Sequence, residues 1–264
     1  MHDFNYHQAA SIGEAQAAFS NSEDPVYLAG GMTLIPTMKQ RLLNPSDVID
    51  LGIIDDFAGV ECTGNQVVVK AMTTHAEVAI NPDVRSAIPA LSALAGSIGD
   101  PHVRNRGTLG GSIANNDPAA DYPAAVVGLG GTVRTTSREI PAGDFFTGMF
   151  ETVLAPDELI KSVSFPIPDV AHYMKFPNPA SRYALVGVMV VRAGTEVRVA
   201  VTGAGSSVFR VAEMEAALES NFDAAAIENI VIPAEGLNND IHASADYRAH
   251  LVSVMASRAA SACS

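Results

Sequence analysis

The residues best suited to chemistry lie in residues 98–123, a stretch rich in glycine. Its centre, residues 107–112, reads Gly-Thr-Leu-Gly-Gly-Ser. Glycine adopts backbone angles that other residues avoid and lets a ligand approach the main chain closely. The hydroxyls of Thr108 and Ser112 flank the paired Gly110 and Gly111. Amides and hydroxyls gathered in this way bind phosphate groups, so the stretch predicts an anion cradle.

A second candidate cradle lies nearer the start of the chain. Residues 26–29 read as a buried strand, and Gly30-Gly31 joins it to residues 34–42, whose apolar side chains recur at helical spacing. Free amides where a helix begins attract phosphate. By itself this signal is weak, because a turn of the same composition without a ligand is at least as common. No GxGxxG or GxxxxGK[ST] motif occurs, which argues against a Rossmann or Walker-type site.

Two cradles of this kind would together hold a diphosphate. Asp121 follows the second cradle and offers a carboxylate that accepts hydrogen bonds from sugar hydroxyls. The residues alone point to a diphosphate with a ribose-like or ribityl-like chain, and they leave its identity open.

Composition excludes several other classes of function. The 264 residues carry a net charge of −13 and no run of Lys or Arg, which opposes binding to nucleic acid. Cys62 and Cys263 form no CxxC pair, and the histidines lack metal-ligand spacing, so we expect no metal site and no iron–sulfur cluster on this chain. No GxSxG motif is present, and we assign no catalytic acid, base or nucleophile.

The predicted elements form an α+β protein in three regions. Residues 1–56 predict a βαβ-like unit, residues 57–168 a second subdomain, and residues 169–264 a three-stranded antiparallel sheet followed by helices over 212–219, 223–230 and 246–262. The sequence shows neither a signal peptide nor an apolar run of membrane-spanning length, so we expect a cytoplasmic protein without a transmembrane segment.

Both glycine motifs match a known family. Residues 28–42, with Pro45 and residues 49–51, closely resemble the first FAD-pyrophosphate motif of the flavoprotein (medium) subunits of molybdenum hydroxylases. Residues 98–112, continuing through Asp117 to Asp121, resemble the second motif. The likeness is strongest to the carbon monoxide dehydrogenase type, extends to the flavin domain of xanthine dehydrogenase, and runs the length of the chain.

The resemblance implies the FAD-binding fold of vanillyl-alcohol oxidase, with FAD between two subdomains and a C-terminal domain after them. It assigns one side of the pyrophosphate to the first motif and the other side to the second, Asp121 to the FAD sugar chain, and Ile160 and Lys175 to the surroundings of the flavin. The residues implied are Ala29, Gly30, Gly31, Met32, Thr33, Leu34, Thr108, Gly110, Gly111, Ser112, Asp121, Ile160 and Lys175. Ser112 stands where the xanthine dehydrogenase branch has Asn, and Thr33 where some members have an acidic residue.

The same resemblance implies an electron-transfer subunit. Electrons would arise at a molybdopterin centre on a large subunit, pass through [2Fe-2S] clusters of a small subunit and reach FAD on this chain. The complex would be a dimer of heterotrimers. This chain would meet the inner face of the membrane only through that complex. Two alternatives stay open: a self-contained flavin oxidase of the vanillyl-alcohol type, and a non-catalytic subunit that binds a diphosphate ligand. The substrate of the molybdenum site and the electron acceptor (quinone, NAD or oxygen) are not encoded in a recognisable way.

Overall fold

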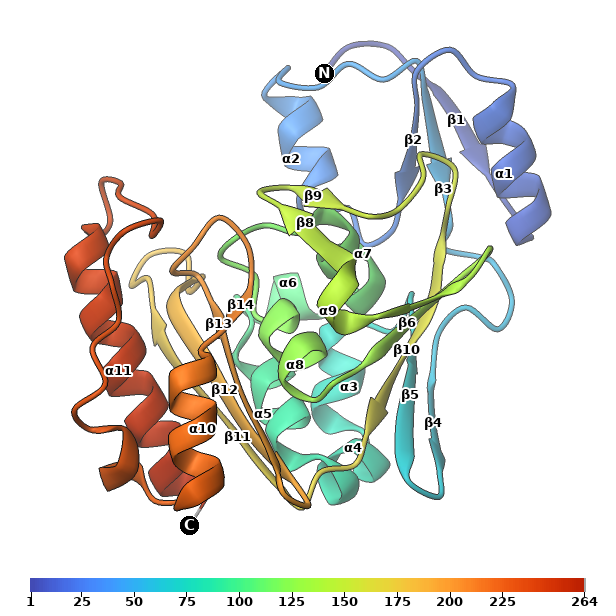
Figure 1. Cartoon of the computed structure of the whole chain (residues 1–264). Helices are drawn as coiled ribbons and strands as arrows, with labels where there is room; N and C mark the ends of the chain where they lie inside the picture. Colours follow the sequence, from blue (N-terminus) through green and yellow to red (C-terminus); the bar gives the residue numbers. More distant parts are fainter. Residues whose placement is uncertain (264) are drawn as a thin grey trace.

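The computed structural model describes residues 1–263 and shows a mixed α/β protein with several sheets (Figure 1). The first sheet is parallel, in the order β1 (Asn5–Gln8), β3 (Asp47–Asp50) and β2 (Pro25–Leu28). The helices α1 (Ile12–Ser20) and α2 (Leu34–Lys39) connect its strands. Parallel strands need such crossovers, and the βαβ-like unit expected from the sequence is present.

The second sheet has five strands in the order β4 (Val60–Thr63), β5 (Gln66–Lys70), β10 (Ile160–Pro166), β6 (Thr132–Thr135) and β7 (Glu139–Pro141). Between β5 and β6 the chain forms a helical layer. It comprises α3 (His75–Ile80), α4 (Pro82–Ala87), α5 (Pro89–Ser97), α6 (Pro101–Arg104), α7 (Leu109–Asn115) and α8 (Tyr122–Gly128). The short α9 (Ala142–Phe145) leads into a hairpin of β8 (Phe146–Gly148) and β9 (Glu151–Thr152).

Local signals explain where several of these helices begin. Thr74 accepts from the amide of Glu77 while the Glu77 side chain accepts from the amide of Thr74, so a capping box begins α3. The Ser11 side chain caps α1 by accepting from the amide of Glu14. Gly130, with a φ of 64°, follows the buried helix α8 and ends it.

The C-terminal sheet differs from the prediction, because it has four strands rather than three. Its order is β11 (Val170–Pro177), β12 (Ala184–Ala193), β13 (Glu196–Thr202) and β14 (Phe209–Arg210). β11 pairs antiparallel with β12 along its length. A pairing across a loop leaves no local pattern, and the sequence therefore did not place β11 in this sheet. Residues 203–207 lie in the connection between β13 and β14, which pair antiparallel.

Two helices cover this sheet, α10 (Ala212–Ser220) and α11 (Ala245–Ala262). The helix predicted over residues 223–230 is instead a short 3₁₀ turn, η1 (Ala224–Ile227). Asp223 accepts from the amide of Ala225 at its start, which favours a tight turn over a longer helix.

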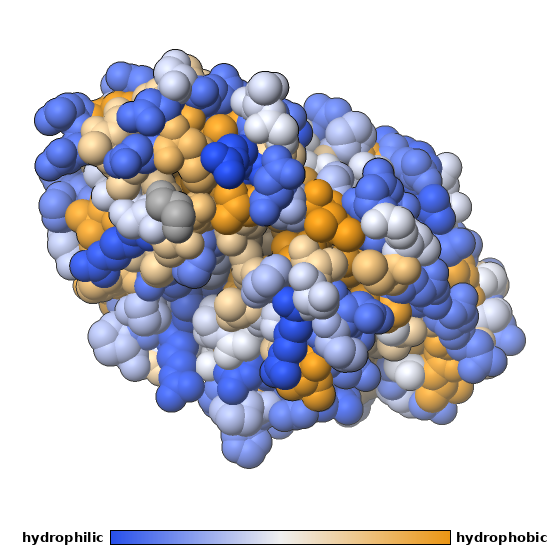
Figure 2. All heavy atoms as spheres, turned by 90° about the horizontal axis from the view of Figure 1, so that it is seen from below, coloured by the Kyte–Doolittle hydropathy of each residue, from blue (hydrophilic) through white to orange (hydrophobic). Residues whose placement is uncertain are grey.

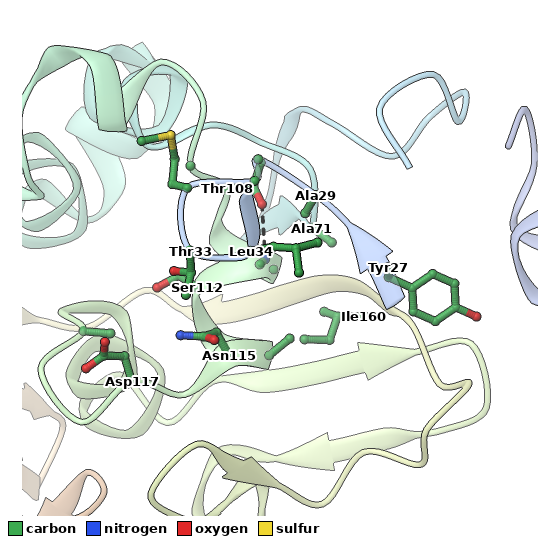
Figure 3. A pocket seen from close by; sticks show the side chains of 18 of the residues that line it. Tyr27, Ala29, Thr33, Leu34, Ala71, Thr108, Ser112, Asn115, Asp117 and Ile160 are labelled. Atoms are coloured by element: carbon green, nitrogen blue, oxygen red, sulfur yellow. Dashed lines mark hydrogen bonds between the residues drawn. The ribbon is translucent and has the colours of Figure 1, made fainter. Parts of the chain in front are cut away.

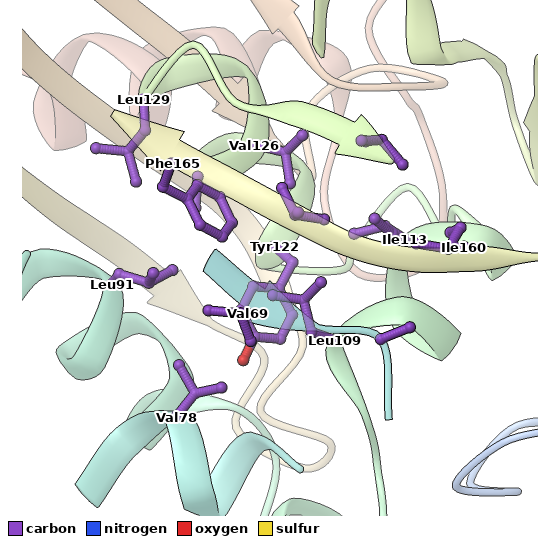
Figure 4. Close-up of a cluster of buried hydrophobic side chains, with 14 of the residues drawn as sticks. Val69, Val78, Leu91, Leu109, Ile113, Tyr122, Val126, Leu129, Ile160 and Phe165 are labelled. Atoms are coloured by element: carbon purple, nitrogen blue, oxygen red, sulfur yellow. The ribbon is translucent and has the colours of Figure 1, made fainter. Parts of the chain in front are cut away.

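Two apolar cores stabilise the molecule. One lies between the five-stranded sheet and the helical layer, where Val69, Leu91, Leu109, Tyr122 and Phe165 pack together (Figure 4). The other fills the space between the C-terminal sheet and its helices. On the face drawn in Figure 2, hydrophobic residues form several patches among hydrophilic ones. Among the described residues, none of the helices combines the length and apolar character needed to cross a membrane.

Candidate functional site

The first wall of the site is the turn between β2 and α2. Gly31 has a φ of 73°, a left-handed conformation that glycine adopts without strain. The amides of residues 30–34 donate no hydrogen bond to any group within residues 1–263. Unpaired amides need a partner from solvent or a ligand. This turn therefore presents a series of free donors, as the first glycine motif predicted.

The second wall is the start of α7, where several main-chain amides already have partners within the protein. The amides of Leu109 and Gly110 donate to the carbonyls of Thr73 and Ala71, at 3.1 and 2.8 Å. Those of Gly111 and Ser112 donate to the side chain and the carbonyl of Thr108. The amides of residues 109–112 are therefore committed within the protein, to partners that include Thr73 and Ala71 from a segment whose approach the sequence did not reveal. What remains available is side-chain oxygen: the hydroxyl of Ser112 makes no hydrogen bond to the described residues.

The glycines serve mainly to bring backbones together. A Cβ on Gly30 would lie 2.0 Å from the carbonyl oxygen of Arg106, and one on Gly110 would lie 2.6 Å from the Cβ of Ala71. Both distances are far below van der Waals contact. The two motifs therefore pack directly on each other. On sequence grounds these glycines were explained by the close approach of a ligand, but at Gly30 and Gly110 the group that approaches is another segment of the protein.

A cleft of about 660 Å³ separates the two walls. This volume lies within the range of roughly 300–1,000 Å³ found for small-molecule sites. Figure 3 shows Thr33, Ser112, Asn115, Asp117 and Ile160 around the same space, with the Thr108–Gly111 hydrogen bond at its edge. The predicted site residues that line this cleft are Ala29, Gly30, Gly31, Met32, Thr33, Leu34, Thr108, Gly110, Gly111, Ser112, Asp121 and Ile160.

Lys175 is the predicted residue that does not line this cleft. It lies on β11, beside a neighbouring cavity of about 450 Å³. Its ammonium is 2.9 Å from Oδ1 of Asp121 and donates to the carbonyl of Ser97 at 3.0 Å. Lys175 therefore contacts Asp121, which lines the cleft, but does not line the cleft itself.

Asp121 is almost fully buried, at 4% exposed. Burial raises the pKa of its carboxyl group, and the Lys175 ammonium and the Tyr173 hydroxyl act in the opposite direction. The Tyr173 hydroxyl donates to Oδ1 at 2.6 Å, while Oδ2 receives only the longer 3.2 Å contact from Lys175. Since a carboxylate oxygen accepts more than one hydrogen bond, Oδ2 keeps capacity for a ligand hydroxyl.

Sequence reasoning missed several residues that line the cleft. Asn115 and Asp117 lie between Ser112 and Asp121, and burial raises the pKa of Asp117. Tyr27 precedes the first motif, and burial raises its pKa to about 12. Tyr183 comes from the loop before β12, and burial raises its pKa too. Polar residues beside the glycines of the motifs were a usable signal for Asn115 and Asp117, whereas nothing local indicated Tyr183.

Within the part of the chain that the structure describes, the His, Cys, Asp and Glu side chains form no cluster of three or more that could hold a metal ion. Cys62 and Cys263 are free thiols, one exposed and one buried. The site is thus a cleft of hydrogen-bond donors and apolar walls, with the buried carboxylates of Asp121 and Glu158 among its lining residues.

Residues 2–168 match the model of the FAD binding domain in molybdopterin dehydrogenase. The chain is 37% identical over 261 residues to the nicotine 6-hydroxylase medium subunit of Paenarthrobacter nicotinovorans, covering 94% of this chain and 92% of that protein. It is 35% identical over 196 residues to the carbon monoxide dehydrogenase medium chain of Afipia carboxidovorans, covering 71% and 68%.

Solved structures agree with these relatives. The reconstituted CO dehydrogenase from Oligotropha carboxidovorans superposes with a TM-score of 0.89 at 30% identity, over 100% of this chain and 99% of that one. Likeness at this identity and coverage extends over residues 169–264 as well as the two cleft walls. The chain therefore belongs to the family of FAD-binding domains in molybdopterin dehydrogenases, and it is an FAD-binding oxidoreductase subunit of the medium-subunit type.

Proposed function

We propose that the cleft holds FAD, with the diphosphate at the Gly30–Leu34 turn and the sugar chain beside Asp121. The observation that carries this placement is the series of unpaired amides over residues 30–34, which face the same cleft as the second motif. Free amides are matched to phosphate oxygens, which only accept hydrogen bonds. The donor set therefore fits the chemistry of FAD.

The second wall contributes side chains in this proposal. The hydroxyls of Thr108 and Ser112 donate to the other side of the diphosphate, and Oδ2 of Asp121 accepts from a hydroxyl of the sugar chain. Ile160, only 5% exposed, offers an apolar wall. These residues bind and orient the cofactor and exclude water. We assign them no proton transfer.

Bound FAD supplies the redox chemistry, because a flavin takes up electrons singly or in pairs. We infer that the chain accepts electrons from the [2Fe-2S] clusters of a small partner subunit, fed by a molybdopterin centre on a large subunit, and passes them to an external acceptor. The medium-subunit relatives support this route. The self-contained oxidase and the non-catalytic subunit are not favoured by these relatives.

The finer assignments belong to the same proposal. We propose a vanillyl-alcohol-oxidase-type arrangement in which residues 1–56 and 57–168 form the two FAD-binding subdomains and residues 169–264 the C-terminal domain. We also propose a dimer of heterotrimers, located in the cytoplasm and meeting the inner membrane face only through its partners.

Two measurements test the proposal. Acid extraction of the purified protein, together with the chains that co-purify with it, identifies the bound cofactor by mass and absorption, and a nucleotide sugar in place of FAD would refute the cofactor assignment. Adding a substrate of the molybdenum partner to the complex should then bleach the flavin band. An unchanged band in a complex that turns over would refute the electron route.

A further inference from the structure

The segment that carries Asp121 is held by the C-terminal domain. The amide of Gly203 donates to the carbonyl of Pro118 at 2.8 Å, and the hydroxyl of Thr202 donates to the carbonyl of Ala120 at 2.6 Å. The amide of Ala184 donates to the carbonyl of Ala119. Strands outside the matched FAD-binding domain, residues 2–168, therefore fix the backbone on which Asp121 stands.

The carboxylate of Asp121 is also held from that domain. Tyr173 and Lys175, both on β11, place a hydroxyl at 2.6 Å and an ammonium at 2.9 Å from Oδ1. Alternate residues on a strand point to the same face, so both donors reach the carboxylate together. Hydrogen bonds to a charged, water-excluded group are stronger than those between neutral groups.

Gly187 makes this contact sterically feasible. It lies within β12, opposite Lys175, and a Cβ on it would stand 2.2 Å from the hydroxyl oxygen of Tyr173. Glycine weakens the interior of a strand and marks a place where another group approaches closely. Here the Tyr173 hydroxyl lies close to Gly187 and donates its hydrogen bond to Asp121.

We infer that Tyr173, seated over Gly187, is a positioning residue that orients the Asp121 carboxylate toward the hydroxyls of the FAD sugar chain. This inference rests on the proposed function. The Tyr173 hydroxyl takes one side of Oδ1, Lys175 balances the charge, and Oδ2 is left to face the ligand. Burial and the charge of Asp121 raise the pKa of Tyr173 well above its usual value, so the hydroxyl remains a donor at neutral pH.

Tyr173→Phe in the full chain tests the inference. Loss of one hydrogen bond to a charged group should raise the FAD dissociation constant about tenfold, measured by titrating the flavin-depleted protein with FAD. Gly187→Ala, which displaces the hydroxyl without changing Tyr173, should act in the same direction. The matched control is Tyr122→Phe, because the Tyr122 hydroxyl is buried without a hydrogen-bond partner within residues 1–263, and its removal should leave FAD affinity unchanged.

A double variant separates positioning from general destabilisation. If Tyr173 acts through Asp121, Tyr173→Phe should have no further effect on FAD affinity in an Asp121→Asn background. The acid limb of FAD binding should also move to higher pH in Tyr173→Phe, because the carboxyl loses a donor while Lys175, Tyr122 and Tyr183 remain around it.

The outcomes are distinguishable. An equal loss of affinity in the Asp121 and Asp121→Asn backgrounds would overturn the inference, as would a Tyr173→Phe protein that loses stability but keeps its FAD affinity and pH profile. If the unsubstituted protein does not bind FAD at all, the proposed function fails, and the inference fails with it.

Discussion

Gly30 lies directly against the backbone of Arg106: a Cβ atom added to Gly30 would stand 2.0 Å from the Arg106 carbonyl oxygen. This contact joins the first glycine motif to the second across more than seventy residues of sequence. The two halves of the cleft are therefore set by a backbone contact that only glycine permits.

Gly30→Ala should force the two motifs apart. We expect the FAD dissociation constant to rise more than tenfold, because a carbonyl oxygen of the backbone cannot move aside as a side chain can. Titration of the flavin-depleted variant with FAD measures this effect. Gly13→Ala is the matched control, since nothing lies within 4 Å of that position in α1. It should keep full affinity and gain about 0.5–1 kcal/mol of stability.

Ser112→Ala removes a hydroxyl that faces the cleft and has no hydrogen-bond partner among residues 1–263. If it donates to the diphosphate, its loss should weaken FAD binding about tenfold, as expected for one hydrogen bond to a charged group, while the free energy of unfolding stays nearly constant. Ser220→Ala, on the exposed end of α10, should change neither quantity. Unaltered FAD affinity in Ser112→Ala would exclude this hydroxyl from the site.

Stability should fall as the pH falls toward 4, because of His75. Burial, with a smaller contribution from the charge of Arg104, lowers the pKa of this histidine to about 4. The ordinary pKa of a histidine is 6.5, so the unfolded chain takes up the proton first and is favoured as the pH drops from 6.5 to 4. Urea unfolding of the full chain from pH 7 to pH 4.5 measures the slope.

His75→Gln should flatten that slope, and the exposed His250→Gln should leave it unchanged. The expected difference between the two variants is about 2 kcal/mol across the window, on the scale of 1.4 kcal/mol for each pH unit of differential protonation. Equal slopes for both variants would show that His75 does not carry the effect.

Local patterns in the sequence predicted much of the fold. The strand over residues 26–29, the helix after Gly30-Gly31 and the helices over residues 212–219 and 246–262 were predicted from patterns of this kind. The first glycine motif was predicted for the same reason, since its free amides follow from a strand-to-helix turn.

What the sequence did not predict depends on partners distant in the chain. The carbonyls of Ala71 and Thr73 accept hydrogen bonds from the amides of Gly110 and Leu109, so these two amides of the second motif have partners that lie far away in the sequence. β11 joined the C-terminal sheet by pairing with β12. Tyr173 and Lys175 contact the Asp121 carboxylate because that sheet packs against the segment before α8. This packing could not be inferred from local sequence patterns.

The central claim is that this cleft holds FAD. The most direct measurement is the amount and identity of flavin released by acid from the protein purified with its co-purifying chains. One FAD per copy of this chain is the predicted result, falling strongly in Gly30→Ala and unchanged in Gly13→Ala. Complexes that contain the chain without FAD, or that retain full FAD in Gly30→Ala, would contradict the account.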